Sequence, residues 1–366
     1  MSQHPTLRDV ARLAEVSIGT ASQALNNKPG VVPETRAKVL RAAETLGYVH
    51  RSRLQPPPLR TLSTIGLLMR VEADEEPGIS TFYTPIIAAA ARECQRQGLS
   101  MMYAAVETDE KHCPRGYPPM LNDKRIDGFL VVGVALEGAL LEQIQRQVHA
   151  PLVLVDAYAP GAEFDSILSD NLNGAIVAVN HLVENGHVCI GLIGSSPDDY
   201  PSIQERRAGY LRALAQHNIT ETYIEDGPLT RQGAYDATLR LLRRAPEVTA
   251  IFGCNDRAAI RAMLAARDLG LGVPDDVSVV GYDDIDAARE TSPPLTTMRV
   301  DKVFMGVLAV RQLRDRLENP DRPALTVTLN TQLTQRKSVR CLIGAERAAA
   351  PVAANAHSAA RSESVV

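Results

Sequence analysis

Apolar residues recur with a helical period near the start of the chain. From Leu7 to Ala14 they follow the i, i+3, i+4, i+7 spacing that gives a helix one apolar face. Thr6, with Asp9 three residues later, is typical of a capping box at the start of such a helix. Ser17 follows in a short turn, where its hydroxyl is placed to cap a second helix. The pattern therefore predicts two short helices joined by a tight turn.

The second predicted helix has two different faces. One face is small and apolar. The other carries neutral residues, most with hydrogen-bonding side chains, at helical spacing: Gly19, Ser22, Gln23 and Asn26. Groups of this kind fit the base edges of DNA, whereas an ordinary surface helix usually carries Lys and Glu. Two interpretations stay open on this pattern alone, namely a helix that reads DNA and the polar face of an ordinary small helical domain.

A third helix is predicted after a loop that contains Gly30. Pro33 favours the first helical position, residues 39–46 carry an apolar stripe, and Gly47 ends the pattern. The stripe predicts that this helix closes a small three-helix core.

Short apolar runs alternate with amphipathic stretches from Ser63 onward. Continuous apolar runs between helices are typical of parallel strands buried on both faces, which predicts two doubly wound α/β lobes. We expect the boundary between the lobes near residues 160–170 and a returning crossover at residues 292–297. The predicted strands are residues 65–69, 99–106, 128–133, 151–156, 189–194, 249–254 and 277–284.

Charge is distributed unevenly along the 366-residue chain. Residues 1–60 contain nine Lys and Arg against four Asp and Glu, whereas the remainder contains 30 against 39. A net charge of +5 near the N-terminus and −9 over the rest suits a protein that binds a polyanion with one end. The hydrophobic content of 45% is that of a globular protein with room for two or three domains.

The sequence argues against several other classes of protein. No stretch approaches the roughly 18 consecutive apolar residues of a membrane helix, and the N-terminus lacks the apolar segment of a secretory signal. Phosphate-binding glycine motifs and Ser-His-Asp or Cys-His groupings are not visible by spacing, so we expect neither an enzyme nor a bound cofactor. The cysteines show no C-x-x-C spacing, which predicts reduced thiols and no metal site: Cys94, Cys113, Cys189, Cys254 and Cys341.

Specific residues of the N-terminal region match a known family. They are T-L-x-D-V-A at 6–11, V-S-x-x-T at 16–20, T-R-x-K-V at 35–39 and L-G-Y at 46–48, together with Asn26. This pattern resembles the helix-turn-helix headpiece of the LacI/GalR family of bacterial transcription regulators, and the likeness continues to about residue 340. The resemblance implies an all-α headpiece followed by two periplasmic-binding-protein-like lobes, each a doubly wound parallel sheet, with a ligand cleft between them.

The resemblance also implies how the chain is divided. The expected segments are a DNA-binding domain at 1–50, a proline-rich hinge at 51–63, an effector-binding and dimerisation domain at 64–343, and a tail at 344–366. We expect the tail to be disordered because it is rich in Ala and Ser and has no periodicity. Within the effector-binding domain, the expected N-lobe is about 64–163 plus 297–322, and the expected C-lobe is about 164–292 plus 323–343.

In this family the second helix enters the major groove, and the two headpieces of a homodimer read a near-palindromic DNA operator. Gln23 stands where many relatives have arginine, which predicts adenine in place of guanine at one position of each half-site. Val32 stands where a hydroxyl residue often touches phosphate, so one backbone contact is expected to be missing. The residues expected to bind DNA are Thr6, Ser17, Ile18, Gly19, Thr20, Ser22, Gln23, Asn26, Thr35 and Tyr48.

The hinge departs from the family pattern. In the family this segment forms a short helix that wedges a leucine into the minor groove, but here three prolines at 56–58 disfavour a helix. Two interpretations stay open: a semi-rigid linker, and a segment whose arginines still follow the DNA phosphates. In either case we expect weaker coupling between effector and operator than in typical relatives.

Residues that directly follow the predicted strands are candidates for the ligand site, because ligands bind at the carboxyl ends of parallel strands. The expected effector-binding residues are Phe82, Tyr83, Asp156, Arg206, Asn255, Asp256 and Asp283. The resemblance implies that Arg206 grips ligand oxygens, and carboxylates, an amide and a guanidinium together suit a sugar or related polyol. Alternatives stay open for Asp256, which can cap a helix, and for Tyr83, which can be a core residue.

These observations predict a cytoplasmic bacterial transcription regulator, expected to act as a repressor under the control of a small molecule. The alternative is a cytoplasmic small-molecule sensor with a weakened DNA-binding headpiece, which the hinge prolines and Val32 favour. Salt-dependent binding to a specific duplex would distinguish the two.

Overall fold

The computed structural model describes residues 5–26, 30–48, 62–71, 81–108 and 114–343. The chain forms two compact units, Met1–Thr61 and Leu62–Val366. Most of the expected hinge and the whole expected tail lie outside the described residues.

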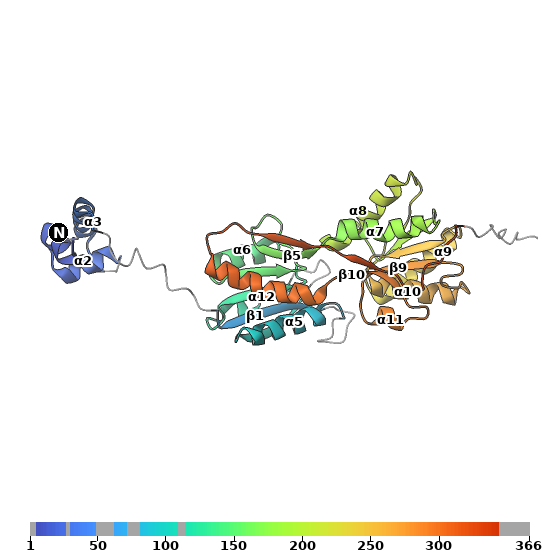
Figure 1. Cartoon of the computed structure of the whole chain (residues 1–366), viewed down its shortest axis with the longest axis horizontal. Coiled ribbons are helices and arrows are strands. Elements are labelled where there is room, and N and C mark those ends of the chain that lie inside the picture. The colour runs from blue at the N-terminus through green and yellow to red at the C-terminus, as the bar shows by residue number, and fades with distance from the viewer. Residues whose placement is uncertain (1–4, 27–29, 49–61, 72–80, 109–113, 344–366) are drawn as a thin grey trace, which may run out of the picture. The chain divides into compact units, whose positions relative to one another are not determined.

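The first unit is a three-helix headpiece (Figure 1). Its helices are α1 (Leu7–Leu13), α2 (Ile18–Leu25) and α3 (Pro33–Leu46). The predicted apolar faces meet in one small core: Val10, Ala11, Ala14, Ala21, Ala24, Val39, Ala42 and Ala43 are all buried. The predicted three-helix core is confirmed.

Local side-chain chemistry sets the ends of these helices. The carboxylate of Asp9 accepts hydrogen bonds from the Thr6 amide at 2.9 Å and the Thr6 hydroxyl at 2.6 Å, at the start of α1. The Ser17 hydroxyl accepts from the Thr20 amide at 3.0 Å and caps α2. Gly47 ends α3 with a φ of 62°, a left-handed conformation that glycine adopts without strain.

The second unit begins with an N-lobe built on a six-stranded, fully parallel sheet in the order β11-β5-β4-β3-β1-β2. Helices α5 and α12 cover one face of this sheet, and α6 packs against the other face. The strands are β1 (Thr64–Val71), β2 (Ser100–Glu107), β3 (Gly128–Val132), β4 (Leu152–Val155), β5 (Asp165–Ser169) and β11 (Thr326–Leu329). The helices are α5 (Tyr83–Arg96), α6 (Gly138–Gln147) and α12 (Lys302–Glu318), with a 3₁₀ turn at Pro119–Asn122.

The C-lobe repeats this arrangement with a six-stranded sheet in the order β12-β10-β9-β8-β6-β7, in which only β12 is antiparallel to its neighbour. Its strands are β6 (Ile190–Ile193), β7 (Tyr223–Glu225), β8 (Ala250–Gly253), β9 (Ser278–Asp283), β10 (Thr296–Arg299) and β12 (Gln332–Thr334). Its helices are α7 (Asn171–Glu184), α8 (Pro201–Gln216), α9 (Arg231–Arg244), α10 (Asp256–Asp268) and α11 (Ala287–Glu290). Helices α7 and α8 cover one face, and α9 and α10 cover the other.

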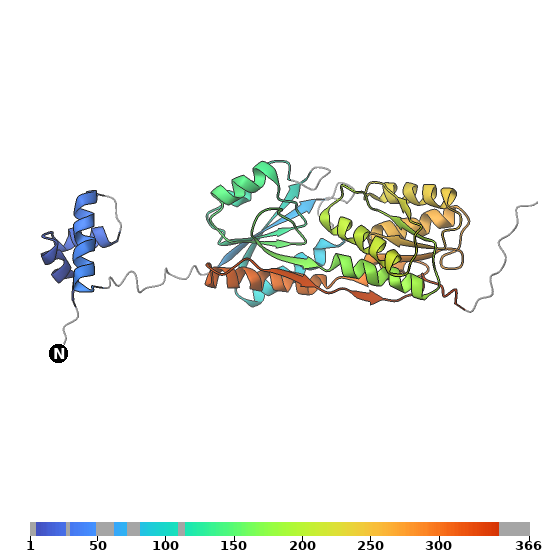
Figure 2. The same cartoon turned by 90° about the horizontal axis from the view of Figure 1, so that it is seen from above.

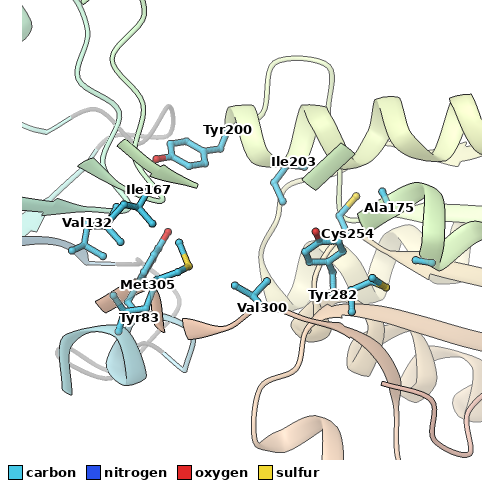
Figure 3. Packing of buried hydrophobic residues seen from close by; sticks show 14 of the residues in the cluster. Tyr83, Val132, Ile167, Ala175, Tyr200, Ile203, Cys254, Tyr282, Val300 and Met305 are labelled. Carbon is cyan, nitrogen blue, oxygen red and sulfur yellow. The ribbon is translucent and has the colours of Figure 1, made fainter. Parts of the chain in front are cut away.

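Within the described residues, three segments cross between the lobes, joining β5 to α7, β10 to α12 and β11 to β12 (Figures 1 and 2). Tyr282 at the end of β9 ties two of them together, because its hydroxyl lies 3.0 Å from the Asp170 carbonyl oxygen and 3.4 Å from the Thr331 hydroxyl. A Cβ at Gly174 would collide with this hydroxyl, so glycine is needed there. One hydrophobic core cluster continues through both lobes (Figure 3).

The strand pairing corrects the expected limits of the lobes. Strand β5 was expected in the C-lobe but pairs with β4, and β10 was expected in the N-lobe but pairs with β9. Strand β11 was expected in the C-lobe but pairs with β5. The chain therefore changes lobe near residues 170, 300 and 330, and not near 163, 297 and 322. The cause is the hydrogen-bonded pairing between strands, which local sequence patterns do not record.

Two further strand expectations are wrong. Residues 292–297 do not cross between lobes, since Thr296 already begins β10 and the crossover follows at Val300 and Asp301. Strand β2 is not buried on both faces, because it lies at the edge of its sheet and leaves Tyr103 45% exposed. In the described part of the chain, no helix has the length and apolarity that crossing a membrane requires.

Candidate effector cleft and DNA-reading helix

The carboxyl ends of strands from both lobes meet at one cleft. Six of the seven expected effector residues line it, namely Phe82, Tyr83, Asp156, Arg206, Asn255 and Asp283. The free volume of this cleft is about 50 Å³, which is enough for a few water molecules and too small for a sugar. The lobes are therefore close together in this structure, and admitting a larger molecule requires them to separate.

Asp156 comes directly after β4 and is 5% exposed. Its backbone has a φ of 46°, a left-handed conformation that is uncommon outside glycine and often found at functional sites. The Tyr83 hydroxyl donates to Asp156 Oδ2 at 3.0 Å, whereas Oδ1 has no hydrogen-bond partner among the described residues. Burial raises the pKa of Asp156 to about 6, although Arg206 and Tyr83 act to lower it. A ligand hydroxyl would satisfy the Oδ1 oxygen.

Aromatic rings form the N-lobe wall of the cleft. Tyr83 packs so closely on Gly133, at the end of β3, that any Cβ there would overlap the ring. Phe82 contacts Tyr83 edge-to-face, with ring centroids 5.0 Å apart. Tyr200 reaches from the start of α8 toward the N-lobe, where its hydroxyl donates to the Asp156 carbonyl oxygen at 2.8 Å (Figure 3). The aromatic wall thus also joins the two lobes.

Arg206 lies at the C-lobe side of the cleft, 4% exposed on α8. Its Nε donates to Asn171 Oδ1 at 3.0 Å and its Nη1 donates to the Cys254 carbonyl oxygen at 2.7 Å. The guanidinium also lies 3.1 Å from the Asp283 carboxylate and 3.8 Å above the Tyr282 ring. Burial opposes the charge on Arg206, but Asp283, Tyr282 and Asp156 raise its pKa, so it remains a cation. These contacts hold the planar guanidinium of Arg206 in one orientation in the absence of a ligand.

Asp283 ends β9 with a φ of 115°, and burial raises its pKa against the opposing effect of Arg206. Asn255 lines the cleft and caps α10, because its Oδ1 accepts from the Ala258 amide at 2.8 Å. The expected helix cap is therefore Asn255 and not Asp256.

Asp256 is the one expected effector residue that lies away from the cleft. It is completely buried, and its carboxylate accepts hydrogen bonds from the Thr297 hydroxyl and from the Ile285 amide at 2.8 Å. Burial is the main cause that raises the pKa of Asp256 well above its usual value, and the nearby negative charge of Asp283 raises it further. Asp256 therefore holds β10 and the end of β9 in place behind the site.

Several residues of the cleft were not predicted from the sequence. Arg70 lies next to the end of β1, 5.6 Å from the centre of the Tyr83 ring and 5.4 Å from that of Tyr200. The same rule that selected Asp156 would have found Arg70, since both lie at the carboxyl end of a parallel strand. The remaining lining residues lie on loops and helix starts without a strand signal: Thr81, Tyr200, Ser202, Ile203, Leu229, Arg257 and Ile285.

The headpiece carries a candidate DNA-binding surface of its own. The expected DNA-binding residues Thr6, Ser17, Ile18, Gly19, Gln23 and Asn26 are exposed, and Thr20, Ser22, Thr35 and Tyr48 are half-buried. Asn26 donates to the Ser22 carbonyl oxygen at 2.8 Å, and the Ser17 and Thr20 hydroxyls are 2.8 Å apart. Most of the expected uncharged stripe on α2, including Gln23, is therefore accessible to a binding partner.

Comparison with known proteins identifies the family. Residues 6–50 match the model of the bacterial regulatory proteins of the lacI family, and residues 179–339 match the periplasmic binding protein-like domain. The HTH-type transcriptional repressor PurR of Mannheimia succiniciproducens is 31% identical over 337 residues, which cover 92% of this chain and 98% of that protein. The chain belongs to the LacI family.

Other LacI-family proteins are similar over the same length. The ribose operon repressor of Haemophilus influenzae is 31% identical over 339 residues, covering 92% of this chain and 99% of that protein. A solved complex of the transcriptional regulator CelR with cellobiose superposes with a TM-score of 0.65 at 28% identity, covering 91% of this chain and 99% of that one. The lac repressor dimer bound to operator and an anti-inducer gives 0.64 at 25% identity, covering 92% and 100%. This LacI-family chain is a DNA-binding transcriptional repressor with a small-molecule effector site, and the predicted fold class is confirmed.

Proposed function

We propose that the chain acts as a cytoplasmic homodimer whose two α2 helices read a near-palindromic operator, and that a sugar or related polyol in the cleft changes operator affinity. The proposal that the effector is a sugar or polyol rests on the side chains that line the cleft. Carboxylates at Asp156 and Asp283 accept hydroxyl donors, Arg206 donates to hydroxyl oxygens, and Phe82 and Tyr83 offer ring faces. Two similar proteins carry names that refer to ribose or cellobiose, which supports this class.

The seven contacts proposed for the effector reduce to six, because Asp256 does not line the cleft. Polyol binding would place hydroxyl groups between Asp156 in the N-lobe and Asp283 with Arg206 in the C-lobe. A molecule that bridges the two lobes in this way shifts their relative position. We propose that this shift alters the spacing of the two headpieces on DNA. The similarity to repressors over almost the whole chain, with the complete headpiece core, supports DNA binding over the alternative of a sensor with a weakened headpiece.

Binding-site selection with the full chain tests the DNA half of the proposal. We expect a near-palindromic consensus and binding that weakens steeply with added salt. A thermal-shift screen of sugars and nucleosides tests the effector half, because a ligand of the folded state raises the melting temperature. A strictly monomeric protein, or equal affinity for every duplex, would contradict the proposal.

Gln23 is expected to select adenine at one position of each half-site, since glutamine pairs with the N6 and N7 edge of adenine. Replacing it with alanine should remove this preference at a cost of about 1–3 kcal/mol per half-site. Gln23→Arg should instead shift the selected base to guanine, which provides the matched comparison. Selection that returns an invariant guanine for the natural chain, lost in Gln23→Ala, would refute the assignment.

A further inference from the structure

Lys302 connects the two lobes at a point that the effector site does not include. It is the first residue of α12, which packs on α5 in the N-lobe, yet its ammonium donates to backbone oxygens of the C-lobe. The acceptors are the Asp283 carbonyl oxygen and, at 3.0 Å, the Asp284 carbonyl oxygen. Lys302 is 9% exposed. Val300, two residues earlier, marks the crossover from which α12 enters the N-lobe (Figure 3).

The backbone that Lys302 binds has an unusual conformation. Asp283 and Asp284 have φ values of 115° and 51°, and two consecutive positive values outside glycine are costly unless surrounding contacts favour them. This conformation directs both carbonyl oxygens toward one ammonium group. A cation shared by two carbonyl dipoles stabilises an arrangement that would otherwise be strained.

Neighbouring contacts fix both ends of this connection. On the C-lobe side, the Asp284 carboxylate pairs with Arg336, whose Nη1 donates to the Leu295 carbonyl oxygen at 2.7 Å. On the N-lobe side, the Lys302 ammonium lies 5.7 Å from the centre of the Phe82 ring, which lines the cleft. The ammonium thus lies between an anchored segment of one lobe and an aromatic wall of the other.

We propose that Lys302 is a positioning residue that holds the end of β9 against the N-lobe, so that the direction of the Asp283 carboxylate in the cleft depends on closure of the lobes. Separating the lobes removes the ammonium from both carbonyl oxygens and releases the backbone on which Asp283 is carried. The cleft of about 50 Å³ cannot admit a sugar without such a separation. Lys302 therefore links the opening of the cleft to the position of the Asp283 carboxylate, which is one of the groups that line the cleft.

Hydrogen exchange of the full chain, measured by mass spectrometry without ligand, tests this inference and does not depend on the effector class. Lys302→Met keeps most of the length of the side chain and removes the charge and the hydrogen-bond donors. We expect backbone amides on both sides of the cleft, in residues 81–86 and 283–286, to exchange at least about five-fold faster. The amides of the central strands β3 and β8 should exchange as in the natural chain.

Two further variants separate positioning from general stability. Lys302→Arg retains a cation with several donors and should restore at least half of the lost protection. Lys124→Met removes an exposed N-lobe lysine and should change nothing. Unchanged exchange at the cleft in Lys302→Met would overturn the proposal. Faster exchange throughout both lobes, or no recovery of protection with arginine, would also overturn it.

Discussion

Replacing Arg206 with alanine is expected to lower the free energy of unfolding of the effector-binding unit by about 3–5 kcal/mol at pH 7, the usual cost of removing one partner of a buried ion pair. The variant removes the guanidinium that lies 3.1 Å from the buried Asp283 carboxylate, together with the donors that serve Asn171 Oδ1 and the Cys254 carbonyl oxygen. Each orphaned acceptor adds to the cost. Urea unfolding monitored by circular dichroism measures the loss.

The pH dependence of this loss gives a sharper test. Burial already raises the pKa of Asp283, and removal of Arg206 takes away the largest effect that lowers it. The folded variant therefore binds a proton at Asp283 more readily than the unfolded chain does, and this binding favours folding as the pH falls. We expect the deficit of Arg206→Ala to be smaller at pH 5 than at pH 7.

Arg146 provides the matched control for Arg206. It pairs with Glu142 at 3.0 Å on α6, but the two side chains are 76% and 64% exposed. Because solvent screens such a pair, Arg146→Ala should cost less than about 0.5 kcal/mol at either pH. Equal losses for Arg146→Ala and Arg206→Ala would show that the buried contacts of Arg206 do not stabilise the fold.

Asp156→Asn is expected to have the opposite effect, stabilising the protein by about 3 kcal/mol at pH 7. The pKa of Asp156 rises from its usual 3.8 to about 6 on folding, chiefly through burial. A carboxyl group with a raised pKa stabilises the fold while protonated, and this contribution is lost as the pH rises from about 4 through about 6. The energy follows from the difference between 3.8 and about 6. Asparagine has no charge to bury, so the gain should vanish near pH 4.

Melting curves between pH 4 and pH 8 measure this effect, with the exposed Asp198→Asn as the control for removing a surface charge. The control should differ from the natural chain by less than about 0.5 kcal/mol throughout. The proposed function adds a second readout, because Asp156→Asn should bind a polyol effector more weakly while folding more stably. Such an exchange of stability for binding is common at ligand sites. A pH-independent difference, or a destabilised variant, would contradict the role of burial.

Periodicity in the sequence is sufficient to predict elements that depend on local pattern. The three headpiece helices, their caps at Ser17 and Gly47, and the strands with uninterrupted apolar runs all follow from it. Strand β5 was not predicted because its sequence, DSILS, contains only two adjacent apolar residues and therefore no apolar run like those of the predicted strands. Its position is set by pairing with β4, the preceding strand, and with β11, which is distant in the chain.

Knowledge of strand ends predicts most of the cleft but not the direction of each side chain. Asn255 and Asp256 follow the same strand, and only the cap geometry shows that the first faces the cleft and the second faces the interior. Lys302 gives no sequence signal, because its function depends on carbonyl oxygens that approach from the other lobe. Tertiary proximity of this kind has no counterpart in local periodicity.

The order of the strands has a consequence for how the protein is made. The edge strands β11 and β12 come last in the sequence, yet they complete different sheets. The N-lobe sheet cannot be finished until Leu329 has been synthesised and the C-lobe sheet until Thr334, whereas the headpiece is complete after Gly47. At a synthesis rate of about 5–20 residues per second, the nascent chain contains a complete headpiece for roughly 15–60 seconds before the effector-binding unit is complete. A premature stop after β10 would release that head with both sheets incomplete.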